Sequence, residues 1–247
     1  MVARTDQATD PAVVADLAEV RLGTASFRRA LSSLSDDDFD AASGLPGWSR
    51  RHLVAHVGYN ARAVARLVTW AATGMEHPMY SSPQARQQEI ELGATLRPQA
   101  LRSLSEHAAI ELDVRWRDLP ADHWQYEVVT AQGRHVPVSE TLWMRTREVW
   151  LHAVDLLTGL RVHDIPDPVK IRLLDDVVGL WSRRGEAVTW RLVESGDAAR
   201  TWGASPVHGV VQVSGDLSAL LAWATGRGTG GRLTWTGAQP QPAPRWL

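Results

Sequence analysis

The stretch SETLWMRTREVWLHAVDLLTG, residues 139–159, places titratable side chains within a helical pattern of apolar residues. Glu148 and His152 are four residues apart, so on a helix they project from the same face about one turn apart. Gly159 is typical of the residue that follows a helix, because glycine adopts the left-handed conformation at little cost. The sequence therefore predicts a helix over residues 139–158 that holds a carboxylate beside an imidazole.

Glu148 lies among large apolar residues, and its carboxylate needs a partner. Burying an unpaired carboxylate costs several kcal/mol. The side chain must therefore pair with a cation, bind a metal or face the solvent. In the simplest alternative to a metal, Arg145 or Arg147 forms an ion pair on the helix surface.

A histidine far away in the sequence favours a metal. The pattern of residues 48–73 predicts a helix with His56 and Asn60 on its inward stripe. Two imidazoles and a carboxylate are a common ligand set for catalytic zinc, and they leave coordination positions for water or substrate. Helical bundles hold metals in their interiors in this way. His56, Glu148 and His152 are therefore the first candidate ligand set.

His52 is also four residues from His56, so an alternative ligand set would use both histidines, with Glu148 or His152 completing it. His52 lies beside Arg50 and Arg51 at the expected start of the helix, which favours a supporting or exposed position. The residues alone leave both ligand sets open.

The other helices expected before Gly159 complete a helical bundle. Helices are expected over residues 11–33 and 98–118, and a polar loop around Tyr80 joins the second helix to the third. Residues 126–138 alternate around a glycine-containing turn, which predicts a small hairpin. Four long helices with one such excursion describe a four-helix bundle.

Beyond Gly159 the sequence alternates between helical and strand patterns. The chain is thus expected to be α+β, with a metal-binding bundle over residues 1–162 and a smaller α+β domain over residues 163–247 that closes over the site. The elements expected in this second domain are helices over residues 169–184 and 216–225 and strands over residues 188–193, 207–213 and 232–235.

Composition narrows the possible functions. The formal net charge of −2 gives no electrostatic argument for binding nucleic acid or an anionic membrane. No apolar run approaches the ~20 residues of a membrane span, and the N-terminus lacks the apolar stretch of a signal peptide, so a cytoplasmic location is expected. The chain has no cysteine. A thiol nucleophile would therefore have to come from outside the chain.

Three segments carry a family resemblance: LPGWSRRHLVAH (residues 45–56), RTREVWLHAVDL (145–156) and DLSALLAWATGRG (216–228). They resemble the mycothiol-dependent maleylpyruvate isomerases, which belong to the DinB-like metal-binding bundles, and the resemblance extends over nearly the whole chain. It implies a DinB-like four-helix bundle followed by a smaller α+β domain. It also implies that His56, rather than His52, binds the metal together with Glu148 and His152.

The resemblance further implies an activity. The expected reaction converts maleylpyruvate to fumarylpyruvate, a step in gentisate degradation, by addition and elimination of a zinc-activated mycothiol thiolate. Arg227 is implied as a contributor from the second domain, although its glycine neighbours also fit a simple turn. Arg86 in the polar loop is another candidate for stabilising negative charge on the substrate. The expected partners are maleylpyruvate and the thiol, with no nucleic acid and no membrane.

Other interpretations fit the same residues. A mycothiol S-transferase would conjugate the thiol to an electrophile, and a non-catalytic sensor module would bind metal without turnover. Nickel or iron could replace zinc at two imidazoles and a carboxylate. Asp155 could orient His152, pair with Arg145 or lie on the surface.

Overall fold

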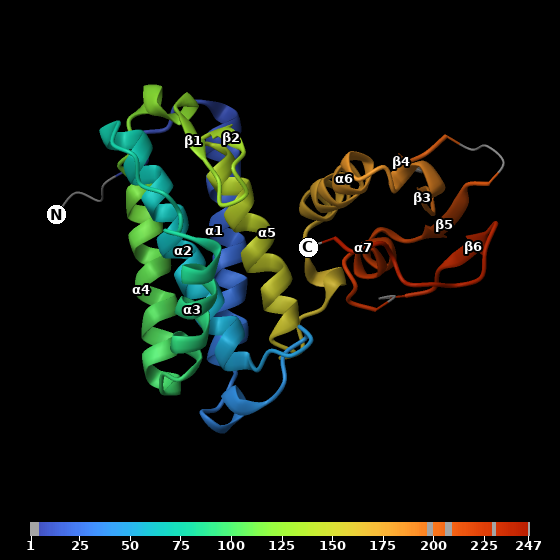
Figure 1. Ribbon diagram of the computed structural model, residues 1–247, viewed down its shortest axis with the longest axis horizontal. Helices are drawn as coiled ribbons and strands as arrows, with labels where there is room; N and C mark the ends of the chain where they lie inside the picture. Colours follow the sequence, from blue (N-terminus) through green and yellow to red (C-terminus); the bar gives the residue numbers. More distant parts are fainter. Residues whose placement is uncertain (1–4, 197–199, 206–208, 229–230, 247) are drawn as a thin grey trace. The chain divides into compact units, whose positions relative to one another are not determined.

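The computed structural model describes residues 5–196, 200–205, 209–228 and 231–246. The chain forms two compact units, Met1–Gly159 and Leu160–Leu247 (Figure 1). The boundary expected between residues 162 and 163 falls within η3 (Val162–Asp164), a short 3-10 helix at the start of the second unit. Closure of the second unit over the site stays a prediction.

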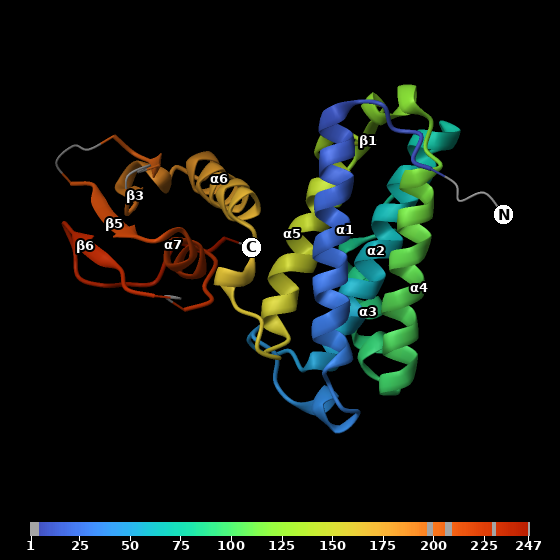
Figure 2. The same ribbon diagram turned by 180° about the vertical axis from the view of Figure 1, so that it is seen from behind.

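The first unit is the predicted four-helix bundle. Its long helices run side by side in both views (Figures 1 and 2), with α2 packed against α4 and α1 against α5. Buried side chains such as Leu17, Val64, Leu112 and Trp116 fill the space between them. The four helices are α1 (Pro11–Ser32), α2 (Arg50–Thr73), α4 (Pro98–Arg117) and α5 (Glu140–Asp155).

The end of α5 differs from the prediction. The helix ends at Asp155 rather than at residue 158, because Leu157 adopts a positive φ of 57°. Arg50, the first residue of α2, donates from its guanidinium to the carbonyl oxygens of Leu156 (2.8 Å) and Leu157 (3.4 Å). The start of α2 is therefore tied to the end of α5, and these are the segments that carry His56 and His152.

The polar loop expected between the second and third helices is wrong in part, because it contains a further helix, α3 (Pro83–Ala94). Ser82 caps this helix by accepting a hydrogen bond from the backbone N–H of Ala85, and Pro83 suits its first turn. Only Ile90 and Gly93 of α3 are buried. The helix therefore lacks the apolar stripe that would have revealed it in the sequence.

The predicted hairpin is confirmed. Strands β1 (Glu127–Val129) and β2 (His135–Pro137) pair antiparallel, with Val128 opposite Val136. Both valines are buried, so one face of the hairpin contributes to the bundle core. The 3-10 helices η1 (Asp37–Asp40) and η2 (Ala121–Gln125) complete the connections of this unit.

The second unit combines two helices with a four-stranded sheet of order β4-β3-β5-β6. β3 and β5 are parallel, whereas β4 and β6 pair antiparallel at the edges. The strand expected over residues 207–213 lies further along the chain, and residues 207 and 208 fall outside the described residues. β4 was not expected from the sequence. The elements are α6 (Asp167–Arg183), η4 (Ala187–Thr189), β3 (Trp190–Glu194), β4 (Thr201–Gly203), β5 (Val211–Gly215), α7 (Leu217–Ala224) and β6 (Thr234–Thr236).

A tryptophan cluster forms much of the core of the second unit. Trp181, Trp190, Trp223 and Trp235 come from both helices and two strands, and neighbouring rings lie with centroids 5.2–6.4 Å apart. These separations are favourable for aromatic pairs. Among the described residues of both units, no helix has the length and apolar character that crossing a membrane would require.

Candidate metal centre

His56 lies on the buried face of α2 and is only 5% exposed. Asn60, one turn further along the same face, is also buried. The ring of Trp48 contacts His56 edge-on, with centroids 5.4 Å apart. Helix position and the Trp48 ring together restrict the orientation of the imidazole.

Three predicted ligands converge inside the bundle. The Nε2 atoms of His56 and His152 lie 2.9 and 3.1 Å from the same Oε2 atom of Glu148. Each of the three side chains offers one ligand atom, and these atoms lie within 4.8 Å of one another. Two imidazole nitrogens and a carboxylate with this spacing can hold one metal ion.

Asp155 orients His152. Its Oδ2 atom lies 2.9 Å from Nδ1 of His152, and its side chain is 1% exposed. Gly44 packs over it: the Gly44 N–H donates to the Asp155 carbonyl at 2.7 Å, and a Cβ on Gly44 would lie 3.0 Å from Oδ1. A histidine whose Nδ1–H is held by a carboxylate presents Nε2 to a metal, as metal-binding histidines commonly do.

The three residues influence one another's protonation. Burial lowers the pKa of His56 below its ordinary value of 6.5, although Glu148 opposes the shift. Burial acts in the same direction on His152, but its hydrogen bonds to Asp155 and Glu148 outweigh it and raise the pKa above 6.5. Burial would raise the pKa of Glu148, yet hydrogen bonds from both imidazoles hold it well below its usual range. Glu148 is therefore a carboxylate at neutral pH.

Arg145 is buried, which differs from the surface ion pair considered from the sequence. Its guanidinium donates to the carbonyl oxygen of Val57 and to Oδ1 of Asn60, both at 2.8 Å. Burial lowers the pKa of Arg145 to about 10, and the nearby charge of Glu148 opposes this shift. Arg145 thus remains a cation at neutral pH and adds a positive charge near the Glu148 carboxylate.

His52 has a different role from His56. Its Nδ1 atom lies 2.8 Å from the hydroxyl of Ser49 and forms a reciprocal cap at the start of α2. Its Nε2 atom faces Glu91 on α3 at 3.4 Å. These contacts explain the histidine at this position without a metal.

Arg86 and Tyr80 lie beside the metal-ligand cluster: Arg86 faces the other ring nitrogen of His56, and Tyr80 contacts Arg86. Nη2 of Arg86 is 3.4 Å from Nδ1 of His56. The phenol of Tyr80 is hydrogen-bonded to the Arg86 guanidinium; burial raises its pKa, and Arg86 opposes this shift. Tyr80 was not a candidate on sequence grounds, because a single aromatic in a polar segment carries no recognisable signal.

Arg227 follows α7 in the second unit. Gly226 and Gly228 have positive φ values of 73° and 84°, and the Arg227 guanidinium donates to the carbonyl of Thr225 at 3.1 Å. The segment thus has the geometry of a turn. A contribution of Arg227 to the site stays a prediction.

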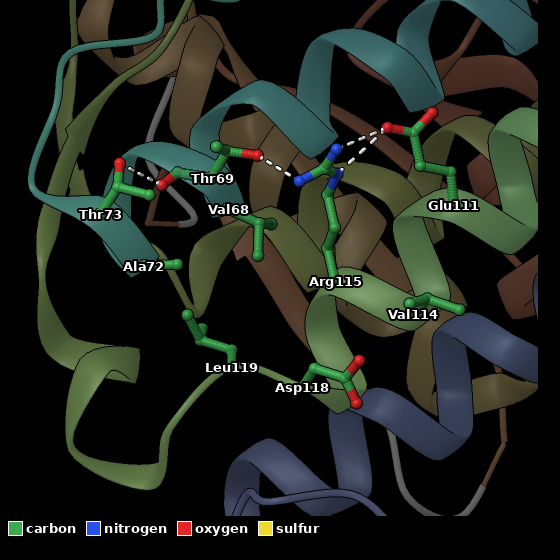
Figure 3. Close-up of a pocket in the computed structure, with 9 residues that line it drawn as sticks. All are labelled: Val68, Thr69, Ala72, Thr73, Glu111, Val114, Arg115, Asp118 and Leu119. Atoms are coloured by element: carbon green, nitrogen blue, oxygen red, sulfur yellow. Dashed lines mark hydrogen bonds and ion pairs between the residues drawn. The ribbon is translucent and has the colours of Figure 1, made fainter. Parts of the chain in front are cut away.

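A separate hollow of about 380 Å³ lies between α2 and α4 (Figure 3). It shares no residue with the cluster of His56, Glu148 and His152. Its arginine, Arg115, already donates to Thr69 at 2.7 Å and to Glu111 at 2.8 Å. We assign this hollow no part in the chemistry.

A helical bundle with two imidazoles and a carboxylate converging in its interior defines the class of metal-binding four-helix bundles. Comparison with known proteins narrows this class. The family model described as mycothiol maleylpyruvate isomerase N-terminal domain matches residues 20–157. The chain therefore belongs to the mycothiol maleylpyruvate isomerase family.

Two solved structures extend the likeness to both units. A crystal structure of the mycothiol-dependent maleylpyruvate isomerase is similar over 95% of this chain and 97% of that chain, with 44% identity and a TM-score of 0.89. A histidine-to-alanine mutant of that enzyme gives the same four values. No curated protein sequence matches the chain significantly.

Proposed function

We propose that this chain is a zinc enzyme that isomerises maleylpyruvate to fumarylpyruvate with mycothiol as its thiol cofactor. The observation that carries the proposal is the convergence of His56, Glu148 and His152 in a chain 44% identical to such an isomerase. The proposed location is the cytoplasm, where thiols are kept reduced.

The donor set fits zinc. His56 and His152 would bind through Nε2 and Glu148 through its carboxylate, and zinc accepts both kinds of ligand. Three protein ligands leave a coordination position open, as in catalytic rather than structural zinc sites. Zinc at this position would supply the charge that keeps the cofactor thiol deprotonated at neutral pH, so that its reversible addition to the conjugated alkene allows rotation.

The chain's own residues prepare the site for this chemistry. Asp155 holds the Nδ1–H of His152, so that Nε2 stays directed at Glu148. Trp48 packs against His56 and shields the ring from water. The reaction places negative charge on the substrate, and preorganised cations stabilise such charge most effectively where water is excluded. Arg227 is the residue of the second unit that we propose for this role.

The chain has no cysteine, so in the proposed mechanism the thiol nucleophile comes from the cofactor and not from the protein. The zinc-loaded protein should isomerise maleylpyruvate only when mycothiol is present, and mycothiol should be recovered unchanged. Turnover without any thiol would contradict the mechanism. A product that retains the thiol would instead identify a transferase.

A further inference from the structure

Helix α3 brings Arg86 to the metal-ligand cluster. Arg86, Ile90 and Gly93 are spaced four and three residues apart and therefore share one face of α3. Ile90 is buried, and Gly93 packs so closely on α2 that an added Cβ would lie 2.7 Å from both Ala55 and Tyr59. Ala55 precedes His56 in the sequence. The packing of α3 on α2 thus fixes Arg86 beside the imidazole.

Tyr80 adds a hydroxyl to the same place. The chain just before it is held by Arg66, whose guanidinium donates to the carbonyl of Met79. The Tyr80 oxygen accepts from Arg86, because a guanidinium has only donors. Its own proton is then available to donate to another acceptor. Arg86 and Tyr80 together form a cationic, donor-rich wall next to His56.

A metal at Nε2 of His56 changes what this wall can bind. Nε2 of His56 faces the Glu148 carboxylate, and with the ring proton on Nε2 the Nδ1 atom can accept from Arg86. With a metal on Nε2, the neutral imidazole carries its proton on Nδ1. Nδ1–H and the Arg86 guanidinium are then two donors 3.4 Å apart. An oxygen placed about 2.8 Å from each donor would satisfy both.

We infer that Arg86, Tyr80 and the Nδ1–H of His56 form a carboxylate-binding subsite beside the metal. A carboxylate suits it because a guanidinium fork, a phenol and an imidazole N–H all donate to anionic oxygens. The ligand class is a small dicarboxylate or 2-oxo acid whose reactive carbons lie next to the bound carboxylate. The inference rests on the proposed function and names the substrate group that this part of the site holds.

Binding of maleate to the zinc-loaded protein, measured by isothermal titration calorimetry, tests the subsite. Losing a charge-assisted hydrogen bond should weaken maleate binding by about 10- to 100-fold in Arg86→Gln. Arg86→Lys keeps the charge without the guanidinium fork, and its affinity for maleate should lie between those of Arg86→Gln and the wild type. Metal-free wild-type protein should also bind maleate more weakly, because Nδ1 of His56 then occupies Arg86.

Arg28→Gln is the matched control. It removes the same charge from an exposed ion pair with Glu106 and should leave maleate binding unchanged. Zinc content and the unfolding curve of each variant establish that the site and fold are intact. If Arg86→Gln does not fold, Tyr80→Phe decides the question, because it removes only the hydroxyl and should weaken maleate binding several-fold.

Two results would overturn the subsite: no binding of maleate by zinc-loaded wild-type protein, or unchanged affinity in fully zinc-loaded Arg86→Gln. The outcome is separable from that of the proposed function. A wild-type protein that binds maleate through Arg86 but does not isomerise maleylpyruvate would retain the subsite and lose the function. If the wild type is a thiol-dependent isomerase and its Arg86→Gln variant binds maleate normally, the proposed function stands and the subsite is refuted.

Discussion

Replacing Asp155 by Asn should weaken zinc binding by about tenfold. The Asp155 carboxylate is 1% exposed and accepts from Nδ1 of His152 at 2.9 Å. A hydrogen bond to a buried charged group contributes about 1.5–3 kcal/mol, and one to a neutral acceptor about 0.5–1.5 kcal/mol. The difference, about 1–2 kcal/mol, corresponds to a loss of roughly 5- to 30-fold in the affinity of the oriented imidazole.

The affinity is best measured by competition with a chromophoric chelator at about pH 8, where protons compete little with zinc for histidine. Asp113→Asn provides the control, since it makes the same chemical change in a half-exposed partner of Arg21. Its zinc affinity should match that of the wild type. Equal affinities in Asp155→Asn and wild type would refute the claim that this carboxylate supports the ligand.

The remaining predictions concern pH and packing. The free energy of unfolding of metal-free protein, measured in urea, should fall on both sides of about pH 6.5. On the acid side, His56 is protonated first in the unfolded chain, because its pKa in the folded protein is lowered. On the alkaline side, the stabilisation by His152, which is complete below 6.5, is lost as the pH rises through its raised pKa. A stability that changes in only one direction across this range would contradict these shifts. Gly93→Ala should lower the free energy of unfolding by about 1–2 kcal/mol, because its Cβ would lie 2.7 Å from Ala55 and Tyr59. Gly179→Ala is the control, because its Cβ would meet only the Arg183 guanidinium at 3.6 Å, and it should raise the free energy of unfolding by up to ~1 kcal/mol. A similar change in the free energy of unfolding at both positions would show that α3 packs loosely.

The long helices of the bundle were predictable because each has an apolar stripe several turns long. α1, α2, α4 and α5 all begin and end within a few residues of their expected positions. α3 was missed because a helix that buries little more than Ile90 and Gly93 shows no stripe. Its cap at Ser82 and its proline at residue 83 were visible in the sequence, but such signals also occur in loops.

Parts of the candidate site could be predicted because helical spacing carries distance information. Glu148 and His152 are neighbours on any helix, so their proximity followed from the sequence. The meeting of His56 with this pair depends on how α2 packs against α5; the inward stripes of a bundle suggested it, and the family resemblance selected His56 over His52. The positions of Arg86 and Tyr80 depend on α3 and its connection, which no periodicity revealed.

The burial of Arg145 was also beyond the sequence. An arginine three residues from a glutamate on a helix usually indicates a surface pair. Here the guanidinium is 2% exposed and binds the backbone of α2 and Asn60. Only the packing of the two helices decides between these arrangements.

Whether His56, and not His52, holds the metal is decided by the zinc content of His56→Ala and His52→Ala. The zinc content is determined on purified protein together with mycothiol-dependent turnover of maleylpyruvate. His52 caps α2, whereas His56 faces Glu148 from the bundle interior. We predict that His56→Ala loses both zinc and turnover, while His52→Ala keeps one zinc per chain and remains active. Full zinc occupancy in His56→Ala, or loss of zinc in a folded His52→Ala, would contradict this assignment of the metal ligand.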